Sequence, residues 1–423
     1  MVRLVNSVLV AAAALFSSTT TAAAASPSAA FVADDLSIAF ALNIPQDDKS
    51  NELYFSISGP RSCSWLAVGM GNGKMDDSLI FMVYSDSSGK NVTLSPRLTS
   101  GHVEPSLTKL VNITLLAGSG IVNNTVTVNA KCSNCRSWNG GIIDPKNNAA
   151  KFIWANGPSG DLKSNSLTAN TRRHASYGTF RMDLTKAVGP AGTPPPATNS
   201  SKESKQLSEK VDHHFASPIH ACIMILSFLG LMPMGVLVLR ILKSPKWHGV
   251  NQAISLVVAL TGVSLGFYIG TFYNRTKKFG SAHQIFGIII AAMMIAQFVL
   301  GFMHHRIYKK TQAPTKLSPI HVWLGRLVIP AGIANGFLGF PLAQNSKYNW
   351  ALVALTLFIV IILAPVAFWR YRRNIQKAKT VEAVGGYDPQ PWRTAAPYPQ
   401  NDINLGQMNY PPPPPPGYNG YNR

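Results

Sequence analysis

The chain has 423 residues, of which 46% are hydrophobic and only 13% are charged, and its net charge is +20. This length allows two or three domains, and so low a charged fraction argues against an ordinary soluble protein and for membrane-spanning segments. A basic balance can indicate a nucleic-acid partner, an acidic membrane surface or the cytoplasmic loops of a membrane protein, so the positions of the charges must decide.

The first 25 residues are typical of a secretory signal peptide. Arg3 gives a positive start, residues 4–16 form a short apolar stretch, and a run of alanines ending at Ala25 offers small residues for cleavage. The residues that follow are therefore expected to be extracytoplasmic. Potential glycosylation sites agree, because all of them fall in segments that this topology places outside: Asn91, Asn112, Asn123, Asn199 and Asn274.

Residues 26–187 predict an all-β domain built as an antiparallel sandwich. Short runs rich in β-branched and aromatic residues recur between Gly, Asn, Asp and Ser clusters, and several alternate apolar with polar residues. Cys132 and Cys135 predict a local disulfide in such a secreted domain. Covalent haem attachment would need His where Arg136 stands, and zinc would need two more ligands nearby. Cys63 is unpaired or pairs with one of these two cysteines.

Residues 188–214 predict a linker, because this stretch of Pro, Ser, Lys and Glu has too little apolar surface to fold alone. A transmembrane domain is expected over 215–372, because five apolar segments there are each near the roughly 20 residues that cross a hydrocarbon core. Residues 373–423 predict a disordered cytosolic tail. Its prolines offer a ligand for a proline-reading partner, although a passive solvated tail is the simpler interpretation. The five segments lie at about 217–241, 249–273, 282–303, 319–342 and 350–370.

The charges set the orientation of these spans. An external N-terminal domain and five crossings put the C-terminus in the cytosol. The segments placed inside hold most of the basic residues around the spans, such as Arg240, Lys310 and Arg373, while the outside loops hold few. This positive-inside bias predicts an integral protein of the plasma membrane or an endomembrane, and it argues against a nucleic-acid partner.

Four histidines lie at or near the starts of the first four spans. Because successive spans run in opposite directions, the first and third histidines belong to the outer face and the other two to the inner face. Neutral imidazole is a good axial ligand for haem iron, so two histidines at each face would hold two haems. Gly287 and Gly325, each one turn after a histidine, would admit a flat macrocycle. The four histidines are His220, His248, His283 and His321.

Two other interpretations of these histidines compete with haem ligation. A single histidine at the membrane interface more often lies among lipid head groups, but four in register on consecutive spans favour ligation. A proton path would need acidic partners, and the spans contain no Asp or Glu. Arg326 lies one turn into the fourth span, where it would neutralise a haem propionate, attract an anionic reductant or extend to the interface.

The membrane segment also has specific sequence features. His220-Ala-Cys-Ile-Met, Trp247-His248, Ala282-His283-Gln284 and His321-Val-Trp-Leu-Gly-Arg326 resemble the cytochrome b561 family, in its five-helix form fused to an extracellular domain, over about 215–370. The resemblance implies two non-covalent b-type haems, one held by His220 with His283 and one by His248 with His321. It also implies transmembrane electron transfer, often with ascorbate as the cytosolic donor and ferric or radical acceptors outside.

The β-domain carries a second resemblance. Its features are Met75-Asp-Asp-Ser-Leu, Cys132-Ser-Asn-Cys135 followed by Trp138, and His174-Ala-Ser-Tyr-Gly-Thr-Phe. They resemble the DOMON fold of the cytochrome domain of fungal cellobiose dehydrogenases over roughly 30–185. The resemblance implies one haem b held by Met75 and His174. Met/His ligation raises the reduction potential relative to bis-histidine, which suits an electron receiver at the outer end. DOMON domains that bind sugars also exist.

These patterns together predict a transmembrane oxidoreductase of the ferric reductase or ascorbate-dependent type, with lipid, a small electron donor and an extracellular acceptor as partners. The tail has no room for a flavin or nicotinamide domain, so the donor is expected to be diffusible or a separate protein. The alternative is a membrane-anchored glycan-binding protein without redox activity. Five spans with four registered histidines are excessive for an anchor.

Overall fold

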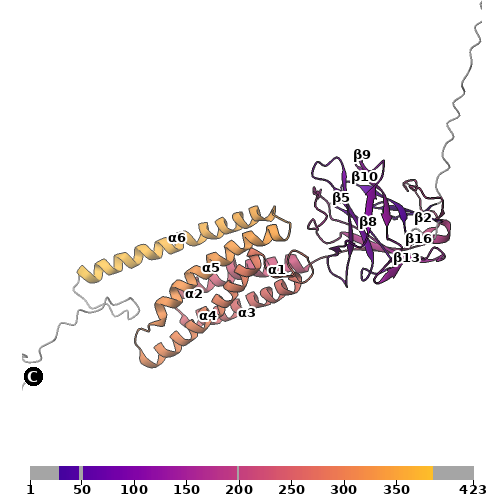
Figure 1. Ribbon diagram of the computed structural model, residues 1–423. Helices are drawn as coiled ribbons and strands as arrows, with labels where there is room; N and C mark the ends of the chain where they lie inside the picture. Colours follow the sequence, from indigo (N-terminus) through magenta and orange to yellow (C-terminus); the bar gives the residue numbers. More distant parts are fainter. Residues whose placement is uncertain (1–27, 47–50, 198–199, 384–423) are drawn as a thin grey trace, which may run out of the picture. The chain divides into compact units, whose positions relative to one another are not determined.

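The computed structural model describes residues 28–46, 51–197 and 200–383. Strands fill the described chain between Ala29 and Val211, and long helices follow from Ala216 to Ala383 (Figure 1). The contacts divide the chain into two compact units, residues 1–298 with 324–359 and residues 299–323 with 360–423, and each is described by itself. The predicted signal peptide, residues 1–25, lies outside the described residues.

The first sheet of the β-domain has seven strands among the described residues. The order is β1-β2-β3-β10-β8, with β15 beside β2 and β9 beside β10. Every pairing is antiparallel except that of β15 with β2. The bounds are β1 Ala29–Val32, β2 Ala39–Pro45, β3 Leu53–Pro60, β8 Asn112–Leu115, β9 Gly120–Val122, β10 Thr125–Ser133 and β15 Val188–Gly189.

The second sheet also has seven strands, in the order β16-β14-β13-β4-β5-β6-β7, and all its pairings are antiparallel. A short hairpin, β11 Ser137–Trp138 with β12 Gly141–Ile142, and a 3-10 turn, η1 Leu184–Lys186, complete the domain. The bounds of the sheet are β4 Leu66–Met70, β5 Leu79–Ser85, β6 Val92–Leu98, β7 Ser106–Leu107, β13 Ala150–Asn156, β14 Ser176–Met182 and β16 Ser204–Val211.

The core lies between the two sheets. Alternate side chains of each strand point to the same face, so one apolar face of each sheet can be buried against the other. Phe40 of the first sheet contacts Phe152 of the second, with ring centroids 5.9 Å apart, and Phe55 stacks on Phe81 at 4.5 Å. All four rings are fully buried. The predicted antiparallel sandwich is therefore confirmed.

The predicted linker, residues 188–214, contains two strands, β15 and β16. β16 pairs with β14 along its whole length, from Ser204 opposite Met182 to Val211 opposite Ser176. Most of its side chains are exposed, so the strand is stabilised by backbone hydrogen bonds at a sheet edge and not by an apolar face. A pattern search based on hydrophobicity misses such a strand, which explains the difference from the predicted disordered linker.

Within the described residues, five helices are long and apolar enough to cross a membrane, which confirms the predicted transmembrane bundle. The first span combines α1, a π-helical turn η2 and α2 without a break. Lys243, with φ of 53°, ends α2, and the Ser244 hydroxyl caps α3 at the amide of Trp247. The bounds are α1 Ala216–Ile225, η2 Leu226–Leu231, α2 Met232–Leu242, α3 Pro245–Gly270, α4 Ala282–Thr311, α5 Leu317–Leu342 and α6 Tyr348–Ala383.

Two helices extend well beyond the predicted spans. α4 continues from the predicted end at 303 to Thr311, and α6 continues from 370 to Ala383. The start of the predicted disordered tail, residues 373–383, is therefore helical. Both extensions are polar but contain no Gly or Pro, so nothing in them ends the helix where the apolar run stops. The rest of the tail lies outside the described residues.

Candidate haem-binding sites

Met75 lies in the loop between β4 and β5. β4 ends at Met70, which pairs with both Leu79 of β5 and Phe152 of β13, so the loop emerges at that end of the sheet. Within the loop, the Asn72 side chain accepts a hydrogen bond from the amide of Lys74 and donates one to the carbonyl of Asp76. These bonds hold the turn that presents Met75, whose side chain is half-buried.

His174 lies at the opposite end of the same sheet, two residues before β14 begins. Ser176 pairs with Asn156, and Asn156 pairs with Leu66 at the start of β4. Leu66 and Met70 are four residues apart along β4, so the two ends of the sheet are separated by about 13 Å at the usual rise of a strand. The register therefore separates the strand ends next to the two predicted ligands, and the pairing of Met75 with His174 stays a prediction. One iron would meet both only if each side chain reached over the sheet face between them.

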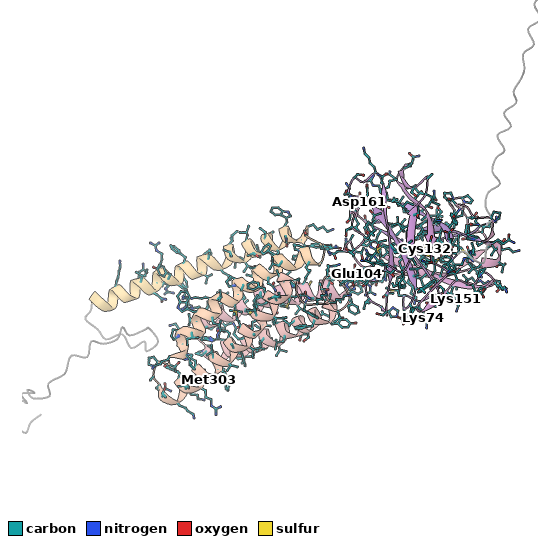
Figure 2. The ribbon with its side chains drawn as sticks, in the orientation of Figure 1. Lys74, Glu104, Cys132, Lys151, Asp161 and Met303 are labelled. Atoms are coloured by element: carbon teal, nitrogen blue, oxygen red, sulfur yellow. A yellow bond between two sulfur atoms is a disulfide. The ribbon has the colours of Figure 1, made fainter. Side chains whose placement is uncertain are left out.

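Side chains labelled in Figure 2 help to locate the two ends of the second sheet. Lys151, whose Cβ lies 2.9 Å from a Cβ placed on Gly73, stands near Lys74 in Figure 2. Asp161 lies toward the other end in the same view, where its carboxylate forms an ion pair with Arg61 at 3.1 Å.

The outer face of that sheet carries a second, smaller apolar cluster. Small residues occupy its centre: Ala67 is buried, and a Cβ on Gly69 would come within 2.5 Å of the Ile153 side chain. Leu162 and Ala169 of the segment between β13 and β14 pack on this cluster. A flat apolar group fits such a floor chemically. The other members of the cluster are Trp65, Ile80, Met82, Tyr84 and Ala155.

His174 has a carboxylate partner that the sequence analysis missed. The Nδ1 atom of His174 lies 3.0 Å from Oδ2 of Asp212, which also contacts the guanidinium of Arg173 at 2.5 Å. The His174–Asp212 contact is close but not aligned as a hydrogen bond. Asp212 directly follows β16, and its amide donates to the carbonyl of Ala175. Nothing in the sequence pattern points to Asp212, because the exposed polar side chains of β16 give no hydrophobic periodicity.

Burial controls the protonation of His174. Desolvation lowers the pKa of His174 to about 4, while the negative charge of Asp212 acts in the opposite direction. The imidazole is therefore neutral near pH 7, which is the form that ligates a metal. A contact from Nδ1 to a carboxylate leaves Nε2 as the ligating atom, an arrangement common around metal-bound histidines.

A buried arginine fastens the segment that ends at His174 to the sheet. Arg97 of β6 donates to the carbonyls of Leu167 and Ala169 at 3.3 and 3.0 Å. Its guanidinium lies 4.0 Å from the carboxylate of Glu104, and both side chains are almost fully buried. Glu104 in turn accepts from the amide and the hydroxyl of Thr171. The approach to His174 is thus held by a buried ion pair.

The remaining predicted sites of the β-domain are cysteines and sequon asparagines. The sulfur atoms of Cys132 and Cys135 are bonded, and Cys63 is a free, half-buried thiol. Asn199 lies outside the described residues. The other sequon side chains of this domain are exposed, as an attached glycan requires: Asn91, Asn112 and Asn123.

In the helical bundle, the structure brings His220 of α1 and His283 of α4 together. Their ring centroids are 6.1 Å apart and the ring planes are nearly perpendicular. A metal–imidazole bond is about 2.0–2.1 Å, so two such bonds in line, with half a ring at each end, span roughly 6 Å. The separation of these rings therefore fits two axial ligands of one metal ion, the arrangement that a b-type haem needs.

The hydrogen bonds of these rings decide which nitrogen is available. Nδ1 of His220 lies 2.7 Å from the carbonyl oxygen of Gly262, and Nδ1 of His283 lies 3.0 Å from that of Asn335. A carbonyl oxygen only accepts, so each Nδ1 carries the proton and donates. Each Nε2 keeps its lone pair and can ligate iron.

His248 of α3 has the same kind of contact. Its Nδ1 lies 2.8 Å from the carbonyl oxygen of Gly235 on α2. His321 of α5 belongs to the other compact unit, so its relation to His248 is not described. The predicted ligation of an inner haem by these two histidines stays a prediction.

Two further residues that the sequence analysis singled out have different environments from those expected. Gly287 and Gly325 do not open a cavity: a Cβ on Gly287 would lie 3.1 Å from the amide of Asn335, and one on Gly325 would lie 2.7 Å from that of Gln297. They permit close packing between α4 and α5. Arg326 is exposed on α5, and its predicted role stays a prediction.

Comparison with known proteins gives two matching families. Residues 17–191 match the family described as the cytochrome domain of cellobiose dehydrogenase, and residues 200–306 match a domain of unknown function, DUF2427. This order is typical of fusions with cytochrome b561. A pyrroloquinoline quinone-dependent pyranose dehydrogenase of Coprinopsis cinerea is 26% identical over 131 residues, 30% of this chain. The match takes in only 18% of that relative.

Two solved structures are also similar. The cytochrome b domain of pyranose dehydrogenase from Coprinopsis cinerea has 22% sequence identity and a TM-score of 0.36, and the match covers 38% of this chain and 83% of that one. The cytochrome domain of Myriococcum thermophilum cellobiose dehydrogenase has 17% identity and a TM-score of 0.33, covering 38% of this chain and 86% of that one.

Proposed function

The chain carries a cytochrome domain of the cellobiose dehydrogenase type followed by a DUF2427 region, and from this premise we propose that it conducts electrons across a membrane. The donor is a cytosolic reductant of the ascorbate class. The acceptor lies outside the cytosol and is ferric iron or a redox protein. A redox role follows from the cytochrome domain itself, while the path, donor and acceptor are the proposal.

The histidine pair at the outer end of the bundle carries this proposal. His220 and His283 come from different helices, face each other at 6.1 Å, and each uses Nδ1 on a backbone carbonyl. Side chains that only lay among lipid head groups would have no reason to be held in one tautomer at this separation. Haem b bound there would supply one-electron redox chemistry.

A second histidine pair and a Met/His pair complete the proposed set of ligands. His248 and His321 would hold a haem toward the cytosolic side, with Arg326 as a cation for a propionate or an anionic reductant. Met75 and His174 would hold a third haem on the outer face of the second sheet. Support for the third comes from the small apolar floor, the neutral His174 and its carboxylate partner Asp212.

The orientation of the protein in the membrane rests on charge. Basic residues crowd the ends of the helices assigned to the cytosol, such as Lys309 and Lys310 at the end of α4. We place the β-domain outside, where its sequons would be glycosylated, and the C-terminus inside. This orientation lets an internal reductant and an external acceptor use opposite ends of the bundle.

A spectrum of the purified full chain tests the proposal first. We expect reduced-minus-oxidised bands of b-type haem, with a haem-to-protein ratio above one. The protein is then placed in vesicles loaded with ascorbate, and reduction of external ferric chelate is followed with wild type and with the His220→Ala variant. Absence of haem bands in the wild type would overturn the proposal and leave a membrane-anchored β-sandwich that binds a ligand.

A further inference from the structure

A glycine packs against the imidazole of three of the four bundle histidines. A Cβ placed on Gly266 would lie 2.9 Å from Cε1 of His220. The same holds for Gly339 and His283, also at 2.9 Å, and for Gly301 and His321 at 2.7 Å. These separations are far inside carbon–carbon contact, which is best near 3.5–4.0 Å, so no larger residue leaves the ring where it is.

The position of the contact on the ring gives it chemical meaning. Cε1 lies between the two ring nitrogens, so a push on Cε1 displaces both. For His220, Nδ1 donates to the carbonyl of Gly262, one turn before Gly266 on α3. For His283, Nδ1 donates to the carbonyl of Asn335, one turn before Gly339 on α5. Carbonyl and glycine together hold the ring in one orientation and direct Nε2.

The residues involved recur at one spacing along three helices. In each of these helices, the positions four, fourteen and eighteen residues after the histidine contact the helix packed against it. At 3.6 residues per turn, eighteen residues are five full turns, and all four positions lie on one face. In α3 the set is His248, Gln252, Gly262 and Gly266; in α4 it is His283, Gly287, Gln297 and Gly301; in α5 it is His321, Gly325, Asn335 and Gly339.

The intermediate positions of these sets also meet. In two helices that pack together, the residue four positions after the histidine of one helix contacts the residue fourteen positions after the histidine of the other. Gly287 meets the Asn335 amide, and Gly325 meets the Gln297 amide, between α4 and α5. Between the first span and α3, Met224 meets Gly262 in the same way. The described parts of the bundle thus contain two antiparallel helix pairs built on one pattern.

The first span departs from the spacing by one residue, and its geometry absorbs the difference. The carbonyl that accepts from His248 belongs to Gly235, fifteen residues after His220 instead of fourteen. Between them lies the π-helical turn η2, Leu226–Leu231. A π-turn accommodates one extra residue within an α-helix, so Gly235 keeps the face that a regular helix would give position fourteen.

We propose that Gly266 and Gly339, each with the backbone carbonyl one turn before it, form sockets that orient the imidazoles of His220 and His283. Gly301 orients His321 through the same contact with the ring, and η2 keeps the contact of His248 with Gly235 in register. This inference rests on the proposed binding of haem in the bundle. The glycines are positioning residues, since they act through the histidines. Their effect is therefore expected in haem binding and in ligand-field spectra.

Alanine substitutions in the full chain test the sockets. Gly266→Ala and Gly339→Ala are expected to weaken retention of the outer haem roughly 10-fold or more, the usual effect of disturbing groups that orient a metal-bound histidine. They should also shift its low-spin electron paramagnetic resonance signal. Gly301→Ala is expected to affect the inner haem instead. Gly249→Ala, on the same helix as Gly266 but with no atom within 4 Å of the added Cβ, is the control.

The crossed design gives each outcome a meaning. A wild type without haem contradicts the proposed function, not the sockets in particular. A wild type with haem, together with socket variants whose spectra and haem retention match those of Gly249→Ala, overturns the sockets alone. Equal loss of both haem signals in Gly266→Ala also overturns the sockets. Such a loss reports general misfolding and not a specific effect on the haem held by His220 and His283. Loss confined to the predicted haem in each variant supports them.

Discussion

In the bundle, each described candidate ligand lies on a helix and directs Nδ1 to the backbone of a neighbouring helix, as His220, His248 and His283 do. In the β-domain, Met75 and His174 lie on loops at opposite ends of one sheet, and His174 has a carboxylate partner. Helical ligands are held by regular backbone, so a change of one residue should propagate along the whole helix. Loop ligands depend on a few side-chain anchors, which can be removed one at a time.

The largest expected effect is removal of a bundle ligand. His220→Ala or His283→Ala leaves the opposite imidazole without its partner across the 6.1 Å gap. We expect the outer haem to be lost and the haem-to-protein ratio to fall by about one, measured by extraction of haem from the purified full chain. An unchanged ratio in both variants would show that these residues are not axial ligands.

Deletion of single residues separates helical register from local packing. Deleting Leu226 should convert η2 into regular α-helix and keep both haems, because the first span then has the spacing of the other three. Deleting Val257, another exposed residue, in α3, should rotate one half of that helix by about 100° and abolish haem binding. Visible spectra of the two variants decide, and similar damage from both would contradict the role given to η2.

In the β-domain, the buried ion pair that anchors the segment before His174 should dominate stability. Arg97→Leu leaves Glu104 buried without its charged partner, and breaking such a pair costs about 3–5 kcal/mol. Arg61→Leu breaks an ion pair that is about one-third exposed, with Asp161, and should cost at most about 1 kcal/mol. Unfolding followed by tryptophan fluorescence compares the two, and equal destabilisation would refute the anchoring role.

The smallest effect expected is at Asp212. Asp212→Asn removes the charge beside Nδ1 of His174 but keeps the shape of the side chain. We expect roughly 10-fold weaker retention of the β-domain haem and a shifted reduction potential, with the bundle haems unchanged. Asp161→Asn, at another carboxylate of this domain, is the control. A potential that does not move relative to this control would remove Asp212 from the site.

The same contrast explains what could be predicted from sequence. Helical periodicity and alternating topology were enough to place His220 and His283 at one face, because a helix converts residue number into direction. The carbonyl partners at Gly262 and Asn335 were not foreseen, since any residue type supplies a carbonyl. Asp212 was missed because its position depends on β16, a strand whose exposed polar side chains give no periodic signal.

Residue spacing also did not reveal that the strands next to Met75 and His174 end at opposite ends of the second sheet. The family resemblance identifies Met75 and His174 as a ligand pair, but it does not say from which end of the sheet each loop emerges. Only the register of β4, β13 and β14 gives it. The expectation that Gly287 and Gly325 admit a macrocycle covers only part of the glycine pattern. The contacts with Asn335 and Gln297 show that it serves the packing of helices.

Strand β16 has a practical consequence for producing the β-domain alone. It forms one edge of the second sheet and covers β14, and its exposed Lys205, Glu209 and Lys210 make that edge a poor template for another chain. A fragment cut at residue 187 would expose the unpaired backbone of β14 and be prone to aggregation by strand addition. A fragment that ends after Asp212 keeps the edge charged and is expected to stay monomeric.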